Sequence, residues 1–157
     1  MTYEIIDFSF RIKIKHRNSY YFVLFKCFII FNGYSNKMKK KILVMDKDDA
    51  ILEIVCYVLK DAGYDVKPLN AENGIYDQIF DYKPDAILLD IVTPTPKGTE
   101  VCNTLKTNAK TKHIPVIVYS THPKVTQTIK QVCADEVLPK PFDIDELLGV
   151  IETYVAR

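Results

Sequence analysis

The sequence predicts an α/β fold, a doubly wound parallel sheet of five strands with five helices. Short apolar runs at residues 41–46, 86–90, 115–120 and 137–140 have the length of buried strands. Helical or turn-bounded segments separate these runs, and such alternation is typical of a parallel sheet covered by helices on both faces. With 157 residues and 48% hydrophobic content, the chain is long enough for one domain with a full core.

The first helix is expected directly after the run at 41–46. Its apolar residues recur at the spacing of one helix face, and Gly63 is placed to end the helix. The residues of this predicted face are Ile51, Ile54, Val55, Val58 and Leu59. A short strand at residues 65–69 and a helix near residues 75–81 follow, which brings the number of expected strands to five.

The second half of the chain continues the alternation. Pro94 and Gly98 mark a turn-rich loop, and a short helix is expected at residues 99–106. Residues 123–132 predict a further helix, although their apolar pattern is weak.

A capping box predicts the last helix. Asp143 and Glu146 stand three residues apart, so each side chain can accept a hydrogen bond from the backbone amide of the other. The apolar residues expected on this helix are Leu147, Leu148, Val150, Ile151 and Val155.

Four of the predicted strands end on a polar residue, namely Asp46, Asp90, Ser120 and Lys140. The carboxyl ends of parallel strands meet at one edge of the sheet, and the crevice outside that edge is where such folds bind ligands. Two carboxylates, a hydroxyl and an ammonium can together hold a cation and a phosphoryl group. Each residue alone is equally well explained by a turn or a helix cap. Their joint occurrence indicates a phosphoryl-transfer site.

Three of these segments resemble those of a known family. Residues 84–90 read PDAILLD, residues 115–120 read PVIVYS, and residues 138–142 read LPKPF. They are similar to the phosphoacceptor segment, the hydroxyl-bearing strand and the Lys-Pro segment of the receiver domain of bacterial two-component response regulators. The similarity runs from about residue 39 to residue 154. It implies the flavodoxin-like receiver fold, with the strand order 2-1-3-4-5.

The resemblance implies a role for each residue of the site. Asp90 matches the nucleophile that becomes an aspartyl phosphate, Ser120 the hydroxyl that binds the phosphoryl oxygens, and Lys140 the ammonium that pairs with them. Asp46 matches the first residue of the family's acidic pair. Together with Asp90 and the backbone carbonyl of Val92, it would hold Mg²⁺.

The implied function is that of a stand-alone phosphoacceptor. A sensor histidine kinase or a phosphotransfer protein would supply the phosphoryl group, and the domain would signal to an unidentified protein target by direct contact. No separate substrate turnover is expected.

Two residues depart from the family pattern. Lys47 stands where the second acidic residue is usual, so Mg²⁺ binding should be weak. Three interpretations remain open: Asp48 supplies the missing ligand, the Lys47 ammonium replaces part of the ion's charge, or the domain signals without efficient phosphorylation. Val137 occupies the position of a switching Tyr or Phe, and a short β-branched side chain has few alternative rotamers.

Two other functions are considered. A phosphorylation-independent pseudo-receiver is favoured by Lys47 and Val137 and opposed by the intact Asp90, Ser120 and Lys140. A phosphatase of the haloacid-dehalogenase type also uses an Asp nucleophile, but Val92 stands where that class has its acidic partner.

Nucleic acid is not expected as a partner. Residues 38–157 carry fifteen basic and eighteen acidic side chains, which leaves no basic footprint. The receiver pattern also runs close to the last residue, so a DNA-binding output domain is not expected.

Residues 1–37 are expected to be an N-terminal extension outside the fold, and residues 38–157 the receiver domain. The apolar stretch at residues 20–31 is interrupted by Lys26 and is too short to span a bilayer. A membrane-surface anchor is the alternative for this aromatic and basic segment. We nevertheless expect a cytoplasmic protein without membrane contact.

The four cysteines are far apart in the sequence. Cys27, Cys56, Cys102 and Cys133 show no paired metal-ligand spacing. They are therefore predicted to be free buried thiols in a reducing compartment.

Overall fold

The computed structural model describes residues 3–7, 10–14, 39–71, 74–93 and 96–156. The chain divides into two compact units, Met1–Met38 and Lys39–Arg157.

The first unit contains a two-stranded antiparallel sheet. Strand β1 (Tyr3–Asp7) pairs with β2 (Phe10–Ile14), and Tyr3 lies opposite Ile14. This pairing was not anticipated from the sequence. The apolar stretch at residues 20–31 lies outside the described residues, and so does Cys27.

The second unit contains a five-stranded sheet in which every pair of neighbouring strands is parallel. Its strands are β3 (Lys41–Met45), β4 (Asp65–Leu69), β5 (Ala86–Asp90), β6 (Val116–Ser120) and β7 (Glu136–Pro139). They lie in the order β4-β3-β5-β6-β7. Numbered within this sheet, the order is 2-1-3-4-5, and the predicted topology is confirmed.

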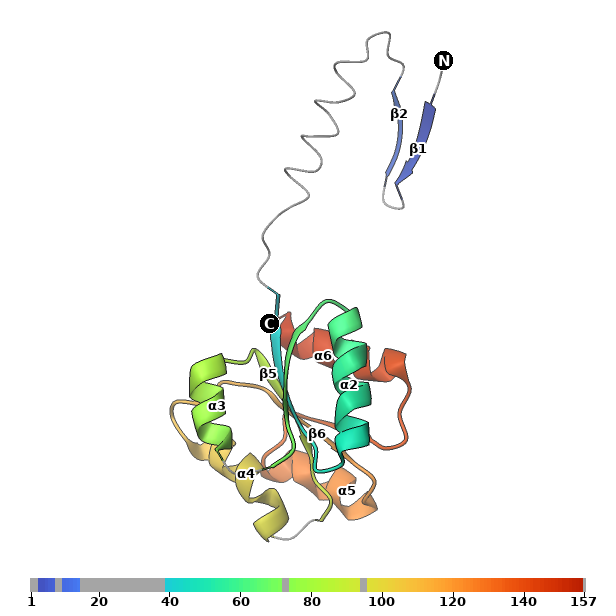
Figure 1. Cartoon of the computed structure of the whole chain (residues 1–157). Coiled ribbons are helices and arrows are strands. Elements are labelled where there is room, and N and C mark those ends of the chain that lie inside the picture. Colours follow the sequence, from blue (N-terminus) through green and yellow to red (C-terminus); the bar gives the residue numbers. More distant parts are fainter. Residues whose placement is uncertain (1–2, 8–9, 15–38, 72–73, 94–95, 157) are drawn as a thin grey trace. The chain divides into compact units, whose positions relative to one another are not determined.

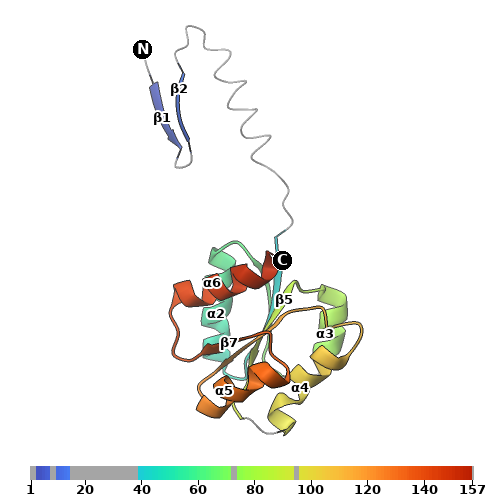
Figure 2. The same ribbon diagram turned by 180° about the vertical axis from the view of Figure 1, so that it is seen from behind.

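Helices cover both faces of this sheet (Figure 1). They are α2 (Asp49–Asp61), α3 (Ile75–Tyr82), α4 (Pro96–Thr107), α5 (Pro123–Val132) and α6 (Ile144–Val155). Helices α2 and α6 lie on one face, and α3, α4 and α5 lie on the other, as the views from the two sides show (Figures 1 and 2). The predicted doubly wound architecture is therefore correct.

Two apolar layers fill the space between the sheet and its helices. Leu43, Leu89 and Val118 pack with α3, α4 and α5 on one face. Val44 and Tyr119 pack with α2 and α6 on the other. Neighbouring residues of a strand thus serve opposite layers, as the twofold repeat of a strand requires.

Helix α2 buries a different face from the one predicted. Its buried residues are Leu52, Val55, Cys56 and Leu59. Ile54 is 61% exposed, although the apolar spacing placed it in the core. Nearly every residue from 51 to 59 is apolar, so two overlapping faces of the helix both show the spacing of a buried helix face. Only packing against the sheet decides which of the two faces is buried.

The helix ends follow the predicted chemistry. Asp143 accepts a hydrogen bond from the Glu146 amide, and Glu146 accepts one from the Asp143 amide, which confirms the capping box. Gly63 lies just beyond α2 with φ of +94°, a conformation that favours glycine.

The prediction of free thiols is wrong for two cysteines. Cys102 of α4 and Cys133 at the end of α5 form a disulfide, with Cα atoms 5.6 Å apart. Their separation in sequence hid this proximity, because the parallel sheet returns the chain to the same face. Cys56 is free and buried, as predicted.

No helix in the described part of the chain is long and apolar enough to cross a membrane.

Candidate functional site at the carboxyl edge of the sheet

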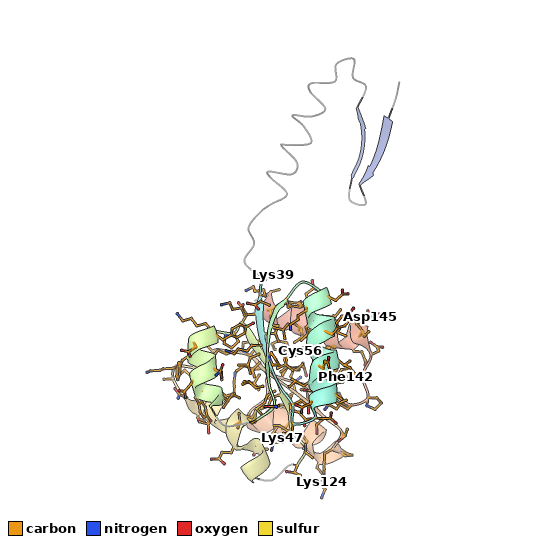
Figure 3. The ribbon with its side chains drawn as sticks, in the orientation of Figure 1. Lys39, Lys47, Cys56, Lys124, Phe142 and Asp145 are labelled. Atoms are coloured by element: carbon orange, nitrogen blue, oxygen red, sulfur yellow. A yellow bond between two sulfur atoms is a disulfide. The ribbon has the colours of Figure 1, made fainter. Side chains whose placement is uncertain are left out.

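Four polar side chains meet at the carboxyl edge of the sheet. Asp46 follows β3, Asp90 ends β5, Ser120 ends β6, and Lys140 follows β7. In Figure 3, Lys47 lies at this end of the domain, whereas Lys39 lies at the opposite end. The topology therefore places together residues that are distant in the sequence.

Lys140 joins the two carboxylates of the site. Its Nζ donates a hydrogen bond to Asp90 Oδ1 at 2.9 Å and to Asp46 Oδ2 at 3.1 Å. The side chains of Lys140, Asp90 and Asp46 are only 17%, 9% and 2% exposed. Removing Lys140 would leave two poorly solvated carboxylates without the ammonium that they share.

Ser120 occupies the next strand end and is fully buried. Its hydroxyl donates a hydrogen bond to the backbone carbonyl of Ile91, the residue after Asp90. The same oxygen accepts a hydrogen bond from the His122 amide at 3.1 Å. Ser120 thus ties the loop after β6 to the loop after β5.

The carboxylates of the loop after β3 bind backbone amides. Asp46 Oδ1 accepts a hydrogen bond from the Asp48 amide at 2.9 Å. Asp48 Oδ1 in turn accepts from the amides of Ala50 and Ile51, and so caps the N-terminus of α2. Helix capping therefore explains why an acidic residue stands at position 48 without any role in metal binding.

The charges around Asp90 oppose one another. Burial raises the pKa of Asp90 and is the largest influence on it. Lys140 lowers this pKa by hydrogen bonding and by its charge, Asp46 raises it, and the Lys47 ammonium lowers it. Lys47 is exposed, yet its charge acts on the carboxylate of the site.

Tyr119 was missed by the sequence reasoning. The Lys140 Nζ lies 4.2 Å from the centroid of its ring, within the range of a cation–π contact. The ring is fully buried and meets Phe142 edge to face at 6.1 Å. The available signal was an aromatic residue immediately before Ser120, in a strand otherwise made of aliphatic residues.

The donor atoms fit a weak site for a hard cation. Asp46 Oδ2 and Asp90 Oδ1 converge on a single ammonium nitrogen, and a small cation needs the same convergence of oxygens. Among the residues that the structure describes, no group of three or more His, Cys, Asp or Glu side chains could hold a metal. Mg²⁺ accepts one or two protein carboxylates and keeps several waters, so two suffice for weak binding.

The other two predicted positions differ in exposure. Val92 is 57% exposed beside Asp90. Val137 is half-buried in β7 and packs on the layer of α3, α4 and α5.

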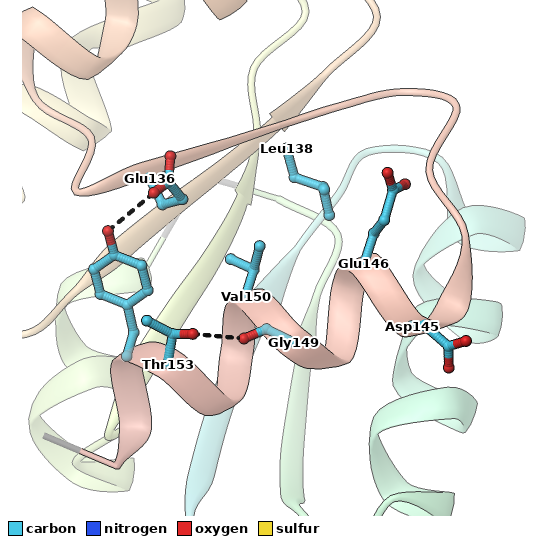
Figure 4. A pocket seen from close by; sticks show the side chains of 8 residues that line it. Glu136, Leu138, Asp145, Glu146, Gly149, Val150 and Thr153 are labelled. Carbon is cyan, nitrogen blue, oxygen red and sulfur yellow. Dashed lines mark hydrogen bonds between the residues drawn. The ribbon is translucent and has the colours of Figure 1, made fainter.

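A shallow pocket between β7 and α6 lies apart from this site (Figure 4). It is lined by Glu136, Leu138, Asp145, Glu146, Gly149, Val150, Thr153 and Tyr154. None of the four strand-end residues is among them. Tyr154 donates a hydrogen bond to Glu136 at 3.2 Å along this wall.

Comparison with known proteins defines the class of this fold and site. Residues 42–152 match the model of the response regulator receiver domain. The chain therefore belongs to the receiver family of two-component response regulators, and the family predicted from the sequence is confirmed.

Curated relatives are longer than this chain. The "DNA-binding dual master transcriptional regulator RpaA" of Synechocystis sp. is 35% identical over 121 residues, which are 74% of this chain and 49% of that protein. The "Response regulator MprA" of Mycobacterium bovis is 32% identical over 122 residues, 76% of this chain and 52% of that protein. The chain spans about half the length of the curated relatives it matches.

Two solved structures match this chain across nearly their whole length. A putative response regulator from Chloroflexus aurantiacus has a TM-score of 0.69 and 26% identity, and the match covers 76% of this chain and 99% of that one. A signal receiver domain from Bermanella marisrubri has a TM-score of 0.68 and 29% identity, covering 75% and 99%.

Proposed function

We propose that this receiver accepts a phosphoryl group on Asp90 from a sensor histidine kinase or a phosphotransfer protein. The observation that carries the proposal is the group formed by Asp90, Asp46 and Lys140, in which one partly buried ammonium is hydrogen-bonded to both carboxylates. This cluster lies at the carboxyl edge of the parallel sheet, which is the edge where α/β folds bind ligands.

In the proposed reaction, an Asp90 carboxylate oxygen attacks the phosphorus of a phosphohistidine. The new bond joins this oxygen to phosphorus. The bond from phosphorus to the imidazole nitrogen breaks, and its electron pair stays on the nitrogen. The product is an acyl phosphate on Asp90. The Lys140 ammonium, 2.9 Å from Asp90 Oδ1, is within reach of the charge that gathers on the phosphoryl oxygens.

Ser120 has to change partner in this reaction. Its hydroxyl is bound to the Ile91 carbonyl and would turn from it to donate to a phosphoryl oxygen. The change at Ser120 alters the contact between the loops after β5 and β6. We propose this exchange as the first step of signalling, since Val137 offers few alternative rotamers in β7.

Mg²⁺ would be held by Asp46, Asp90 and the Val92 carbonyl. When bound, it supplies positive charge that neutralises the phosphoryl oxygens during the attack. Lys47 and Lys140 bring two further positive charges to this site, so the affinity for the ion should be low.

We propose signalling through contacts with a protein target, without separate substrate turnover and without contact to nucleic acid. The balance of fifteen basic to eighteen acidic side chains in residues 38–157 supports this. The domain would work in the cytoplasm, where kinases obtain their phosphoryl groups. Residues 1–37 would be dispensable for the fold, because the sheet and its helices lie within residues 39–157.

Lys47 and Val137 favour a second candidate, a pseudo-receiver that binds its partner without phosphorylation. Such a module would not need Asp90 as a phosphoacceptor. It would bind its target equally well after Asp90→Asn.

Intact-mass measurement after incubation with acetyl phosphate and Mg²⁺ tests the proposal. The wild type should gain one phosphoryl group, and Asp90→Asn should gain none. Asp143→Asn is a matched control, because it removes a carboxylate at a helix cap outside the strand-end cluster. Equal labelling of wild type and Asp90→Asn would place the phosphoryl group elsewhere, and absence of labelling would favour the pseudo-receiver.

A further inference from the structure

The disulfide between Cys102 and Cys133 lies in the layer of α3, α4 and α5. Cys102 is fully buried within α4, and Cys133 is 6% exposed at the C-terminal cap of α5. The bridge spans 31 residues of sequence. It therefore fixes two helices whose relative position would otherwise depend on packing alone.

These two helices continue from the two loops of the phosphoryl site. Helix α4 follows the loop that begins after Asp90, and α5 begins just after the loop that follows Ser120. The two loops also touch directly, because the Ser120 hydroxyl donates to the Ile91 carbonyl. The segments that follow β5 and β6 are thus joined twice. The Ser120 hydroxyl is hydrogen-bonded to the Ile91 carbonyl, and a disulfide joins α4 to the end of α5.

This double connection has a mechanical consequence. If Ser120 leaves Ile91 for a phosphoryl oxygen, as proposed above, the loops after β5 and β6 would rearrange, and the helices attached to them would adjust. A covalent bond between α4 and α5 restricts that adjustment, whereas two thiols permit it. The restriction acts on Val125 and Ile129 of α5 as well, which share one apolar layer with both cysteines.

We propose that Cys102 and Cys133 form a reversible redox switch, in which oxidation ties α4 to α5 and slows phosphorylation of Asp90. The effect on Asp90 rests on the function proposed above. The reversibility of the bridge and its effect on α4 do not depend on that function.

The exchange chemistry balances with a small thiol as reductant. Its thiolate attacks the sulfur of Cys133, the more accessible of the pair, and Cys102 departs as a thiolate. A second small thiolate then attacks the small-molecule sulfur of the mixed disulfide and releases Cys133 as a thiolate. Both protein thiolates take up a proton, and the two small thiols end as one small disulfide. A small disulfide drives the reverse reaction.

Cys56 provides an internal control. It is buried on the opposite face of the sheet, in the layer of α2 and α6, and it is free. Burial raises the pKa of its thiol, which disfavours the reactive thiolate. Cys56 should stay reduced under conditions that oxidise the pair.

The test equilibrates the full chain in glutathione buffers of stepped ratio, with Cys27→Ser as background to prevent bridges between copies. Quenching by acid, alkylation and peptide mass spectrometry report each cysteine. Cys102 and Cys133 should convert together across the series, while Cys56 stays alkylated throughout. A bridge that persists at every ratio, or forms at none, overturns the switch.

Hydrogen exchange gives a readout that is independent of phosphorylation. Amides of α4 should exchange faster in the reduced protein than in the oxidised one, and those of α2 should exchange equally. The double variant Cys102→Ala/Cys133→Ala should match the reduced protein in every buffer, with Cys56→Ala as the matched control that keeps the switch. Equal exchange of α4 in both forms overturns the link between the helices.

Labelling by acetyl phosphate then tests the coupling to Asp90. The reduced form should label about fivefold faster than the oxidised form, the low end of typical coupling between two sites. Equal labelling rates overturn the coupling, even if α4 exchange differs. If neither form labels, the proposed phosphoacceptor function and the coupling fall together, and the exchange result still decides whether the bridge restrains α4.

Discussion

The Lys140 ammonium rests over the ring of Tyr119, 4.2 Å from its centroid, while it holds both carboxylates of the site. A Lys side chain is long and flexible, so its head group needs fixed surroundings to stay in one place. The buried ring supplies a surface that attracts the ammonium from below. Tyr119 is therefore a positioning residue for Lys140.

Replacing Tyr119 by Leu should displace Lys140. We expect slower labelling by acetyl phosphate, by about tenfold, because small misplacements of a catalytic group are costly. The free energy of unfolding should fall by about 2 kcal/mol or more, from the lost aromatic contacts and the space left behind. Labelling rates and urea unfolding check the two effects.

Tyr119→Phe is the matched control. It keeps the ring under Lys140 and removes only the hydroxyl, which has a long hydrogen bond of 3.5 Å to the Met45 carbonyl and also interacts with the Asp46 carboxylate. Because the ring stays in place, this variant should slow labelling much less than Tyr119→Leu does. If Phe and Leu slow labelling equally, the ring does not position Lys140.

Lys47→Asp should strengthen Mg²⁺ binding. A unit charge about 4 Å from a divalent ion contributes on the order of 2 to 8 kcal/mol, depending on the local dielectric. Removing a positive charge and adding an oxygen donor should therefore raise the affinity by roughly tenfold or more. Isothermal titration of Mg²⁺ measures the affinity directly, without any phosphorylation.

Lys124→Asp serves as the charge-matched control for Lys47→Asp. Lys124 lies at the same end of the domain, in the first turn of α5 (Figure 3). Both variants replace Lys by Asp, so each changes the net charge by the same amount. It should alter Mg²⁺ affinity much less. Labelling of the wild type in EDTA, lost in Lys47→Asp, would instead mean that Lys47 replaces the ion's charge. Equal affinities in the wild type and Lys47→Asp would contradict the weak-metal argument.

Glu136 predicts a pH-dependent stability. Burial acts to raise its pKa, but hydrogen bonds from Lys130 and from the Val137 amide outweigh burial, and the pKa is lowered. A carboxyl with a lowered pKa in the folded state stabilises the fold above its unfolded pKa, about 4.3, and loses this contribution as the pH falls through the folded pKa. The difference in stability between wild type and Glu136→Gln should therefore shrink below about pH 4.

Urea unfolding of both proteins between about pH 7 and pH 3 measures this difference. Glu53→Gln, at an exposed position of α2, is the control and should show a smaller trend. A constant difference between wild type and Glu136→Gln across the range would mean that the hydrogen bonds to Glu136 do not stabilise its charged form.

A chain beginning at Met38 should fold by itself. The five-stranded sheet and its five helices lie within the second unit. Its thermal unfolding should remain cooperative, with a midpoint within about 3 °C of the full chain, because the change in unfolding free energy should be less than about 1 kcal/mol. Circular dichroism melts compare the two chains. A broad transition, or an insoluble product, would show that the first unit contributes to the fold.

The position of the site could be predicted from the sequence, whereas its internal contacts could not. The strand ends placed Asp46, Asp90, Ser120 and Lys140 at one edge, because topology alone brings parallel carboxyl ends together. The partners depend on side-chain geometry. Nothing in the spacing indicated that Lys140 reaches both carboxylates, or that the Ser120 hydroxyl binds the Ile91 carbonyl.

The errors have physical causes as well. Ile54 was assigned to the core because α2 is apolar on nearly all sides, and periodicity fails when there is little contrast. The disulfide between Cys102 and Cys133 was overlooked because a contact between two helices that are distant in the chain leaves no pattern in the local sequence. The capping box of α6 was predicted correctly, since caps are encoded by residues three positions apart.

The hydrogen bonds of Asp46 and Asp48 have a consequence for how this receiver would sense a cation. Both carboxylates fasten the loop after β3 to backbone amides, and Asp48 also starts α2. A loop tied in this way keeps its shape before any ion arrives. Binding would then alter the electric field at Asp90 while leaving the path of the backbone unchanged. The loop after β3 would stay fixed while the charge beside Asp90 changes. Movement in the domain would begin on the other side of Asp90, at Ser120.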